Sequence, residues 1–133
     1  MTSTQSGPVI YVIDDDRSMR RSLRRLLKVS GWHVKAFASA EAFLAELETL
    51  GGGFLLVDIQ LPGITGLELL ERLQELAVPC RVIAMSGSSD ATVEAQALRL
   101  GATTFLHKPF DPQVLLDALE QMAQAHEMAR ILG

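Results

Sequence analysis

Residues 9–16 read Val-Ile-Tyr-Val-Ile-Asp-Asp-Asp, a hydrophobic run that leads directly into three aspartates. A short, nearly continuous hydrophobic run is typical of a strand that is covered on both faces of a parallel sheet. Residues 54–58, Phe-Leu-Leu-Val-Asp, repeat this arrangement. The two stretches therefore predict two buried strands, each with an acidic residue immediately after it.

Runs of this kind alternate along the chain with longer stretches that have the hydrophobic spacing of helices, which is typical of βαβ units around a parallel sheet. The predicted strands are residues 9–13, 33–37, 54–57, 81–85 and 104–106. Only residues 33–37 alternate between hydrophobic and polar side chains, which indicates an edge strand, whereas the other four suit strands covered on both faces. We predict a single doubly wound α/β domain with five strands and five helices.

Turn-forming residues mark the ends of the predicted helices. Gly31 and Gly101 follow the first and fourth helical stretches, where glycine commonly ends a helix. The second helix is expected to end before the three glycines at residues 51–53. Asp111 and Pro112 suit the N-cap and the first position of the last helix.

Length and composition bound the class of protein. A chain of 133 residues has the size of one domain, and a net charge of -4 argues against a dedicated nucleic-acid binder. Cys80 is the only cysteine, so neither a disulfide framework nor a thiolate metal cluster is expected. The N-terminal residues are polar, and no hydrophobic run approaches the ~20 residues needed to span a bilayer. We predict a cytoplasmic protein that contacts neither nucleic acid nor membrane directly.

Polar side chains follow four of the predicted strands at the point where each strand ends. Asp14 and Asp15 follow the first strand, Asp58 the third, Ser86 the fourth and Lys108 the fifth. Ligands of doubly wound sheets bind at the carboxyl ends of the strands, so these side chains are expected to form one site. Clustered carboxylates require a proton or a cation, and oxygen ligands of this kind suit Mg²⁺.

This set of residues predicts phosphoryl transfer, in which positioning and charge neutralisation do most of the work. Asp58 stands alone at the centre of the sheet and is the predicted nucleophile, because carboxylates can form aspartyl phosphate. Asp14 and Asp15 are the predicted metal ligands. Lys108 supplies a fixed positive charge for a phosphoryl oxygen, and Ser86 supplies a hydroxyl.

Several motifs together resemble a response-regulator receiver domain of the CheY-like superfamily. They are residues 12–16, residues 56–63, Gly66, residues 83–87 and residues 108–110, and the resemblance covers about residues 9–122. It implies a flavodoxin-like strand order of 2-1-3-4-5. It also implies a signalling domain rather than an enzyme that acts on an outside substrate. The only chemistry of such a domain would be self-catalysed phosphotransfer and autodephosphorylation.

The resemblance assigns a role to each matching residue. Asp58 would be the phosphoacceptor and would contact Mg²⁺ together with Asp15, with Asp14 completing the acidic pair. The backbone carbonyl of Gln60 would be a third metal ligand, and the side chains of Gln60 and Ser88 would tune dephosphorylation.

Ser86, Lys108 and Phe105 have their own implied roles. Ser86 and Lys108 would hold the phosphoryl group, and the peptide bond between Lys108 and Pro109 would be cis. Phe105 stands where many receivers have a switch tyrosine. A switch that uses a phenolic hydroxyl is therefore excluded, but an aromatic ring that turns inward is not.

The implied partners are a sensor histidine kinase or phosphotransfer protein, a downstream target or output domain, and a second copy of the chain on phosphorylation. Six basic residues on the first helix fit a solvated face, a nucleic-acid surface or a docking surface for the phosphodonor. They are Arg17, Arg20, Arg21, Arg24, Arg25 and Lys28.

We expect a tail that is disordered or extended at residues 1–8, a receiver domain at residues 9–126 and a helix end or linker start at residues 127–133.

A haloacid-dehalogenase-type phosphatase is the alternative from another class. It would use Asp14 as the nucleophile, with Asp16, Ser86 and Lys108 in supporting roles. This alternative lacks a late acidic pair after Lys108 and gives Asp58 no task. The cognate kinase, the pathway, the output and the choice between a free-standing regulator and part of a longer protein stay open.

Overall fold

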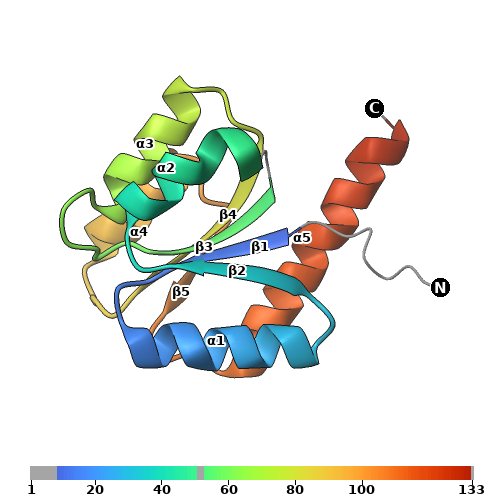
Figure 1. The fold of residues 1–133 in the computed structure, drawn as a ribbon, viewed down its shortest axis with the longest axis horizontal. Coiled ribbons are helices and arrows are strands. Elements are labelled where there is room, and N and C mark those ends of the chain that lie inside the picture. Colours follow the sequence, from blue (N-terminus) through green and yellow to red (C-terminus); the bar gives the residue numbers. More distant parts are fainter. Residues whose placement is uncertain (1–8, 51–52, 133) are drawn as a thin grey trace.

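The computed structural model describes residues 9–50 and 53–132 as a three-layer α/β domain (Figure 1). The predicted tail at residues 1–8, Gly51, Gly52 and Gly133 lie outside the described residues. The elements in chain order are β1 (Val9–Ile13), α1 (Arg17–Val29), β2 (His33–Phe37), α2 (Ala40–Leu50), β3 (Gly53–Asp58), α3 (Gly66–Glu75), β4 (Cys80–Ser86), α4 (Ala91–Arg99), β5 (Thr104–His107) and α5 (Pro112–Leu132).

The five described strands form one parallel sheet in the order β2-β1-β3-β4-β5. The predicted fold class and strand order are therefore confirmed. As predicted, β2 is an edge strand with alternating exposure. The expectation that the other four strands are covered on both faces is wrong for β5, which forms the opposite edge of the sheet and in which Leu106 is buried but His107 is exposed.

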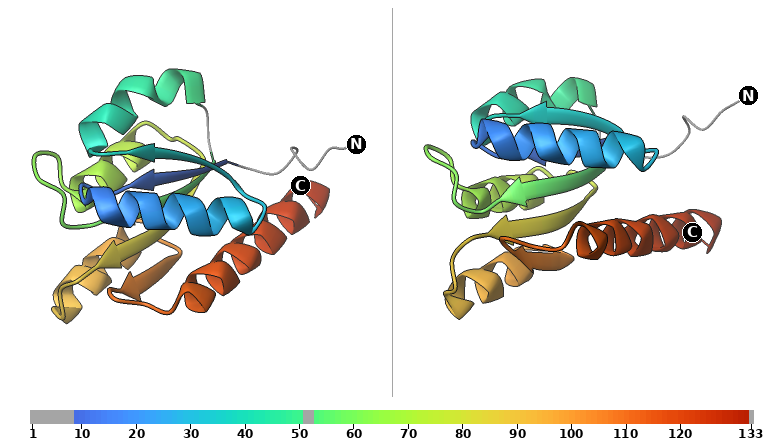
Figure 2. Two further views of the ribbon diagram at one scale, coloured as in Figure 1. Left: turned by 60° about the horizontal axis from the view of Figure 1, so that its bottom comes forward. Right: turned by 90° about the horizontal axis from the view of Figure 1, so that it is seen from below.

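The helices cover both faces of the sheet (Figure 2). On one face, α1 and α5 pack against the side chains of Ile10, Val12 and Phe54, and on the other face α2, α3 and α4 pack against Tyr11, Ile13 and neighbours. The central strands β1 and β3 are buried along nearly their whole length. Hydrophobic burial on this scale fixes the register of the strands, and hence which polar residues reach the carboxyl edge.

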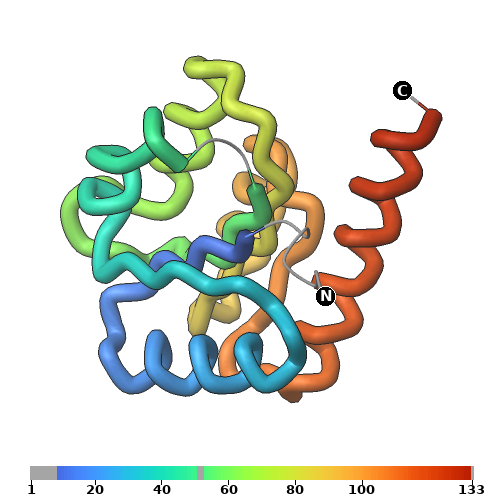
Figure 3. The backbone as a smooth tube through the Cα atoms, turned by 45° about the vertical axis from the view of Figure 1, so that its right-hand side comes forward, coloured from blue at the N-terminus to red at the C-terminus, as the bar shows by residue number. Residues whose placement is uncertain are grey.

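Helix ends follow the turn chemistry read from the sequence. Gly31 and Gly101 adopt positive φ values of 94° and 105°, the conformation that favours glycine after a helix. Asp16 caps α1 by accepting hydrogen bonds from the Ser18 and Met19 N–H groups, at 2.9 and 3.2 Å. Residues 127–132 are helical and belong to α5, which extends beyond the sheet (Figure 3).

No helix in the described part of the chain has both the length and the hydrophobicity needed to cross a membrane.

Candidate functional site

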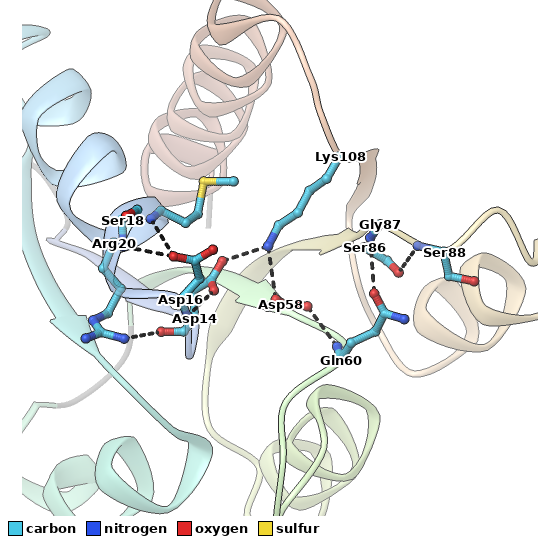
Figure 4. A network of polar contacts seen from close by, with 11 residues as sticks. Asp14, Asp16, Ser18, Arg20, Asp58, Gln60, Ser86, Gly87, Ser88 and Lys108 are labelled. Atoms are coloured by element: carbon cyan, nitrogen blue, oxygen red, sulfur yellow. Dashed lines mark hydrogen bonds and ion pairs between the residues drawn. The ribbon is translucent and has the colours of Figure 1, made fainter.

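The four strand ends bring the predicted site residues together at one edge of the sheet (Figure 4). Asp14 comes from the end of β1 and Asp58 from the end of β3, and both carboxylates are buried, with 0% and 6% of the residue exposed. Asp15 is exposed. One carboxylate oxygen from each of these three aspartates lies within 4.8 Å of the others.

Lys108 joins the two buried carboxylates. Its Nζ donates hydrogen bonds to Asp14 Oδ2 at 2.8 Å and to Asp58 Oδ2 at 3.0 Å. Lys108 reaches this position because its N–H donates to the Ser86 carbonyl at 2.8 Å, and the peptide bond to Pro109 is cis as the resemblance implied. One ammonium group thus faces two carboxylates inside the protein.

The electrostatics of this cluster follow from burial and from the pairing of one ammonium group with two carboxylates. Burial raises the pKa of Asp14 above its ordinary value, and this outweighs the hydrogen bonds from Lys108 and from the Asp16 N–H, which lower it. Burial lowers the pKa of Lys108, but the hydrogen bonds from its ammonium group to Asp14 and Asp58 raise the pKa by more. Lys108 therefore stays charged, and the cluster favours an additional cation.

Asp58 has its remaining oxygen held by the loop that follows it. The Gln60 N–H donates to Asp58 Oδ1 at 2.8 Å, and the Gln60 side chain reaches across to β4, where its Oε1 accepts from the Gly87 N–H at 3.2 Å. Gly66 lets this loop close, because a Cβ there would lie 2.6 Å from Ile59 Cα and 2.7 Å from the Asp58 carbonyl oxygen.

Ser86 is fully buried at the end of β4. Its Oγ accepts a hydrogen bond from the Ser88 N–H at 2.9 Å, and Ser88 Oγ in turn accepts from the Asp90 N–H at 3.0 Å. Among the described residues, Ser86 Oγ makes no hydrogen bond to Asp58. The hydroxyl is therefore engaged with the β4–α4 loop rather than with the carboxylate cluster.

Phe105 lies on β5 opposite Ala84 and is half-buried on the α4 side of the sheet. Its ring packs edge-on against the His107 imidazole, with centroids 5.0 Å apart. The His107 imidazole also contacts the Glu94 carboxylate of α4, at 3.0 Å between Nε2 and Oε1. The ring of Phe105, the predicted switch residue, thus lies on the side of β5 that faces α4.

Two residues near the site carried no sequence signal. Arg20 donates from Nη1 to the Asp14 carbonyl at 2.8 Å, and Glu41 Oε2 accepts from the Ile64 N–H at 3.1 Å. Both contacts hold loops that border the site. In the sequence, Arg20 is one of six basic residues on a helix, and Glu41 is an ordinary charged residue of a helical first turn, so neither stands out.

The other basic residues of α1 are not part of this cluster. Arg21 and Arg25, together with Ser18 and Ser22, line a shallow surface depression on the helix. Arg17, Arg24 and Lys28 are also exposed. The structure therefore shows an exposed basic face, and this exposure fits a solvated face, a nucleic-acid surface and a docking surface alike.

Comparison with known proteins identifies the class. The protein-family model for the response regulator receiver domain matches residues 10–120, so the chain belongs to the response-regulator receiver family. It is a signalling domain of two-component systems rather than a conventional enzyme, and membership in this family rules out the dehalogenase-type phosphatase.

Among particular relatives, the transcriptional regulatory protein FixJ of Bradyrhizobium diazoefficiens is 40% identical over 120 residues, which are 90% of this chain and 58% of FixJ. The response regulator protein TmoT of Ectopseudomonas mendocina is 37% identical over 84% of this chain and 50% of its own length. The chain thus spans about half the length of these curated relatives.

Solved structures show the same architecture. A CheY-like receiver domain protein from Methanospirillum hungatei superposes with a TM-score of 0.86 at 29% identity, covering 93% of this chain and 99% of that one. Full-length FixJ from B. japonicum gives a TM-score of 0.85 at 40% identity, covering 92% of this chain and 61% of that one.

Proposed function

We propose that this domain accepts a phosphoryl group on Asp58, with Mg²⁺ as cofactor, and that phosphorylation switches its conformation. The observation that carries the proposal is the buried contact of Lys108 with both Asp14 and Asp58 beside the exposed carboxylate of Asp15. This arrangement supplies a nucleophile, a fixed positive charge and a cluster of metal ligands at one sheet edge.

Asp58 is the proposed nucleophile because it is central in the sheet and its carboxylate is aligned by hydrogen bonds at both oxygens. In the proposed step, an Asp58 oxygen attacks the phosphorus of a phosphohistidine. An O–P bond forms and the N–P bond of the donor breaks, leaving its electron pair on the imidazole nitrogen. Lys108 neutralises charge on the phosphoryl oxygens as they arrive.

The donor set fits Mg²⁺. Asp14, Asp15 and Asp58 offer carboxylate oxygens within 4.8 Å of one another, and the backbone carbonyl of Gln60 lies in the loop directly after Asp58. When bound, Mg²⁺ supplies neutralising charge for the transferring phosphoryl group.

The proposed switch uses contacts that exist only after phosphorylation. A phosphoryl group adds about -1.5 to -2 charges and strong acceptor oxygens, so Ser86 gains a partner for its hydroxyl. If Ser86 turns toward Asp58, space opens beside β4, and the neighbouring ring of Phe105 can turn inward. Because the group binds the two conformations unequally, it shifts their populations. Gln60 and Ser88, which lie in the loops that follow Asp58 and Ser86, are the proposed tuners of dephosphorylation.

The proposed partners follow from this chemistry. A sensor histidine kinase or phosphotransfer protein supplies the phosphoryl group, and the exposed basic face of α1 is its proposed docking surface. The surface formed by α4, β5 and α5 is proposed to engage a downstream target, an output domain or a second copy of the chain.

Incubation with acetyl phosphate and Mg²⁺, followed by intact mass spectrometry, tests the proposal. We expect one added phosphoryl group in the wild type, none in Asp58→Ala, and slower addition in Asp14→Ala. Persistence of the modification in Asp58→Ala would exclude Asp58 as the acceptor.

The switch needs its own measurement. With beryllofluoride and Mg²⁺, amide chemical shifts are expected to change from Asp58 through Ser86 to residues around Phe105 and Gln113. Shifts confined to the loops of Asp14, Asp15 and Asp58 would mean that the signal does not propagate.

A further inference from the structure

The side chain of Gln60 connects two loops that border the site. Gln60 belongs to the β3–α3 loop, and its N–H donates to Asp58 Oδ1 at 2.8 Å. Its side-chain Oε1 accepts from the N–H of Gly87, the first residue of the β4–α4 loop, at 3.2 Å (Figure 4). One residue therefore ties the loop after Asp58 to the segment that directly follows Ser86.

The β4–α4 loop is held in its present form by a second hydrogen bond next to the first. Ser86 Oγ accepts from the Ser88 N–H at 2.9 Å. A rotation of the Ser86 side chain that carries Oγ toward a group on Asp58 would carry it away from the Ser88 N–H. Gly87 lies between Ser86 and Ser88, so a shift of the loop that accompanies this rotation would move its peptide groups, and the bond from its N–H to Gln60 Oε1 would oppose that shift.

The surroundings of Gly87 offer little else to hold it. A Cβ placed on Gly87 would meet no described atom within 4 Å except Gln60 Oε1, at 3.8 Å, and Gly87 is itself exposed. Gly87 is therefore restrained by its hydrogen bond rather than by packing. Gln60 is exposed too, so the bond competes with water and is weak enough to open in response to a ligand.

We propose that the Gln60 side chain is an autoinhibitory latch, which holds Gly87 and hence Ser86 in the unphosphorylated arrangement and must release before the phosphoryl group is gripped. This inference rests on the proposed function and adds a regulatory step to it. The Gln60 carboxamide thereby affects acceptance of the phosphoryl group, beyond the proposed tuning of its removal.

The size of the effect follows from the type of contact. A single neutral hydrogen bond at an exposed position changes an equilibrium by a factor of about 2 to 10. Gln60→Met keeps the length of the side chain and the backbone carbonyl but removes the acceptor. Gln60→Asn keeps the amide but shortens the chain, so that it no longer reaches Gly87. Gln124→Met, on the exposed end of α5, is the matched control.

Two measurements on the full chain test the latch. The first is hydrogen exchange of the Gly87 amide by NMR without ligand, which we expect to be about 2 to 10 times faster in Gln60→Met and Gln60→Asn than in the wild type and Gln124→Met. The second is the affinity for beryllofluoride with saturating Mg²⁺, which we expect to be tighter in both Gln60 variants by a similar factor.

Unchanged Gly87 exchange in both Gln60 variants would overturn the latch. Faster exchange with equal or weaker beryllofluoride affinity would also overturn it, because the contact would then not be inhibitory. Failure of the proposed function is distinguishable, since beryllofluoride would then bind neither the wild type nor any variant, whereas failure of the latch alone leaves beryllofluoride binding to the wild type intact.

Discussion

Replacing Lys108 by methionine is expected to destabilise the metal-free protein strongly. The substitution keeps most of the side chain's packing but removes the ammonium group that lies 2.8 Å from Asp14 Oδ2 and 3.0 Å from Asp58 Oδ2. Asp14 is fully buried and Asp58 nearly so, so both carboxylates would remain in a poorly solvated place without a counter-charge.

The magnitude follows from two typical costs. Breaking a buried ion pair from one side typically costs about 3–5 kcal/mol. Protonating one carboxyl group would relieve part of the unpaired charge, and at pH 7 that step costs about 4 kcal/mol for an aspartate with an ordinary pKa of 3.8. We therefore expect a loss of about 3 kcal/mol in the free energy of unfolding, or a fall of roughly 10 °C in Tm.

The loss is also expected to depend on pH. Without Lys108, the pKa of Asp14 rises further above its ordinary value, so between pH 3.8 and that raised pKa the folded state binds more protons than the unfolded state. The free energy of unfolding then falls with rising pH across this window. The loss of unfolding free energy in Lys108→Met relative to the wild type should therefore be small near pH 4 and reach its full value at pH 7. Adding Mg²⁺ at pH 7 should restore part of the lost stability.

Urea unfolding followed by circular dichroism, at several pH values and without metal, checks this prediction. Lys35→Met is the matched control, because Lys35 pairs with Glu46 at 2.8 Å on the surface, where loss of the pair costs at most about 1 kcal/mol. If Lys108→Met loses no more stability than Lys35→Met at pH 7, the buried charge cluster does not have the energetics described above.

Three further predictions concern the loops and the metal. Gly66→Ala should lower the free energy of unfolding by about 1–3 kcal/mol in a urea titration, since its Cβ would lie 2.6 and 2.7 Å from two main-chain atoms, whereas Gly87→Ala should have little effect. The hydrogen bond from the Ile64 N–H lowers the pKa of the Glu41 carboxyl group. The contribution of Glu41 to stability is therefore present above its ordinary pKa of 4.5 and is lost as the pH falls through the lowered value. Glu41→Gln should make the free energy of unfolding depend less on pH in this acidic range. Asp15→Asn should weaken Mg²⁺ binding in calorimetry, and unchanged affinity would remove Asp15 from the metal site.

The strand ends were predictable because hydrophobic periodicity fixes them. A nearly continuous run such as residues 54–57 is distinctive, and the aspartate after it must fall at the carboxyl edge once the sheet is parallel. The cap of α1 at Asp16 and the turn at Gly31 are equally local. The sequence alone therefore places Asp14, Asp58, Ser86 and Lys108 at one site.

Contacts between loops could not be predicted in this way. The hydrogen bonds from Gly87 to Gln60, from Ile64 to Glu41 and from Arg20 to Asp14 depend on side-chain directions that no periodicity specifies. Likewise, the sequence predicts that the hydroxyl of Ser86 lies at the site but does not predict that it accepts from the Ser88 N–H. Tertiary geometry and the state of the site decide such contacts.

The central claim is that Asp58 receives the phosphoryl group, and the most direct test is to locate the modified residue. Phosphorylated wild-type protein would be reduced with borohydride, which converts an aspartyl phosphate to homoserine, and then digested and mapped by tandem mass spectrometry. We predict homoserine at residue 58 and unmodified aspartate at residues 14 and 15. Homoserine at residue 14, with residue 58 unchanged, would contradict the assignment of the nucleophile on which the proposed function depends.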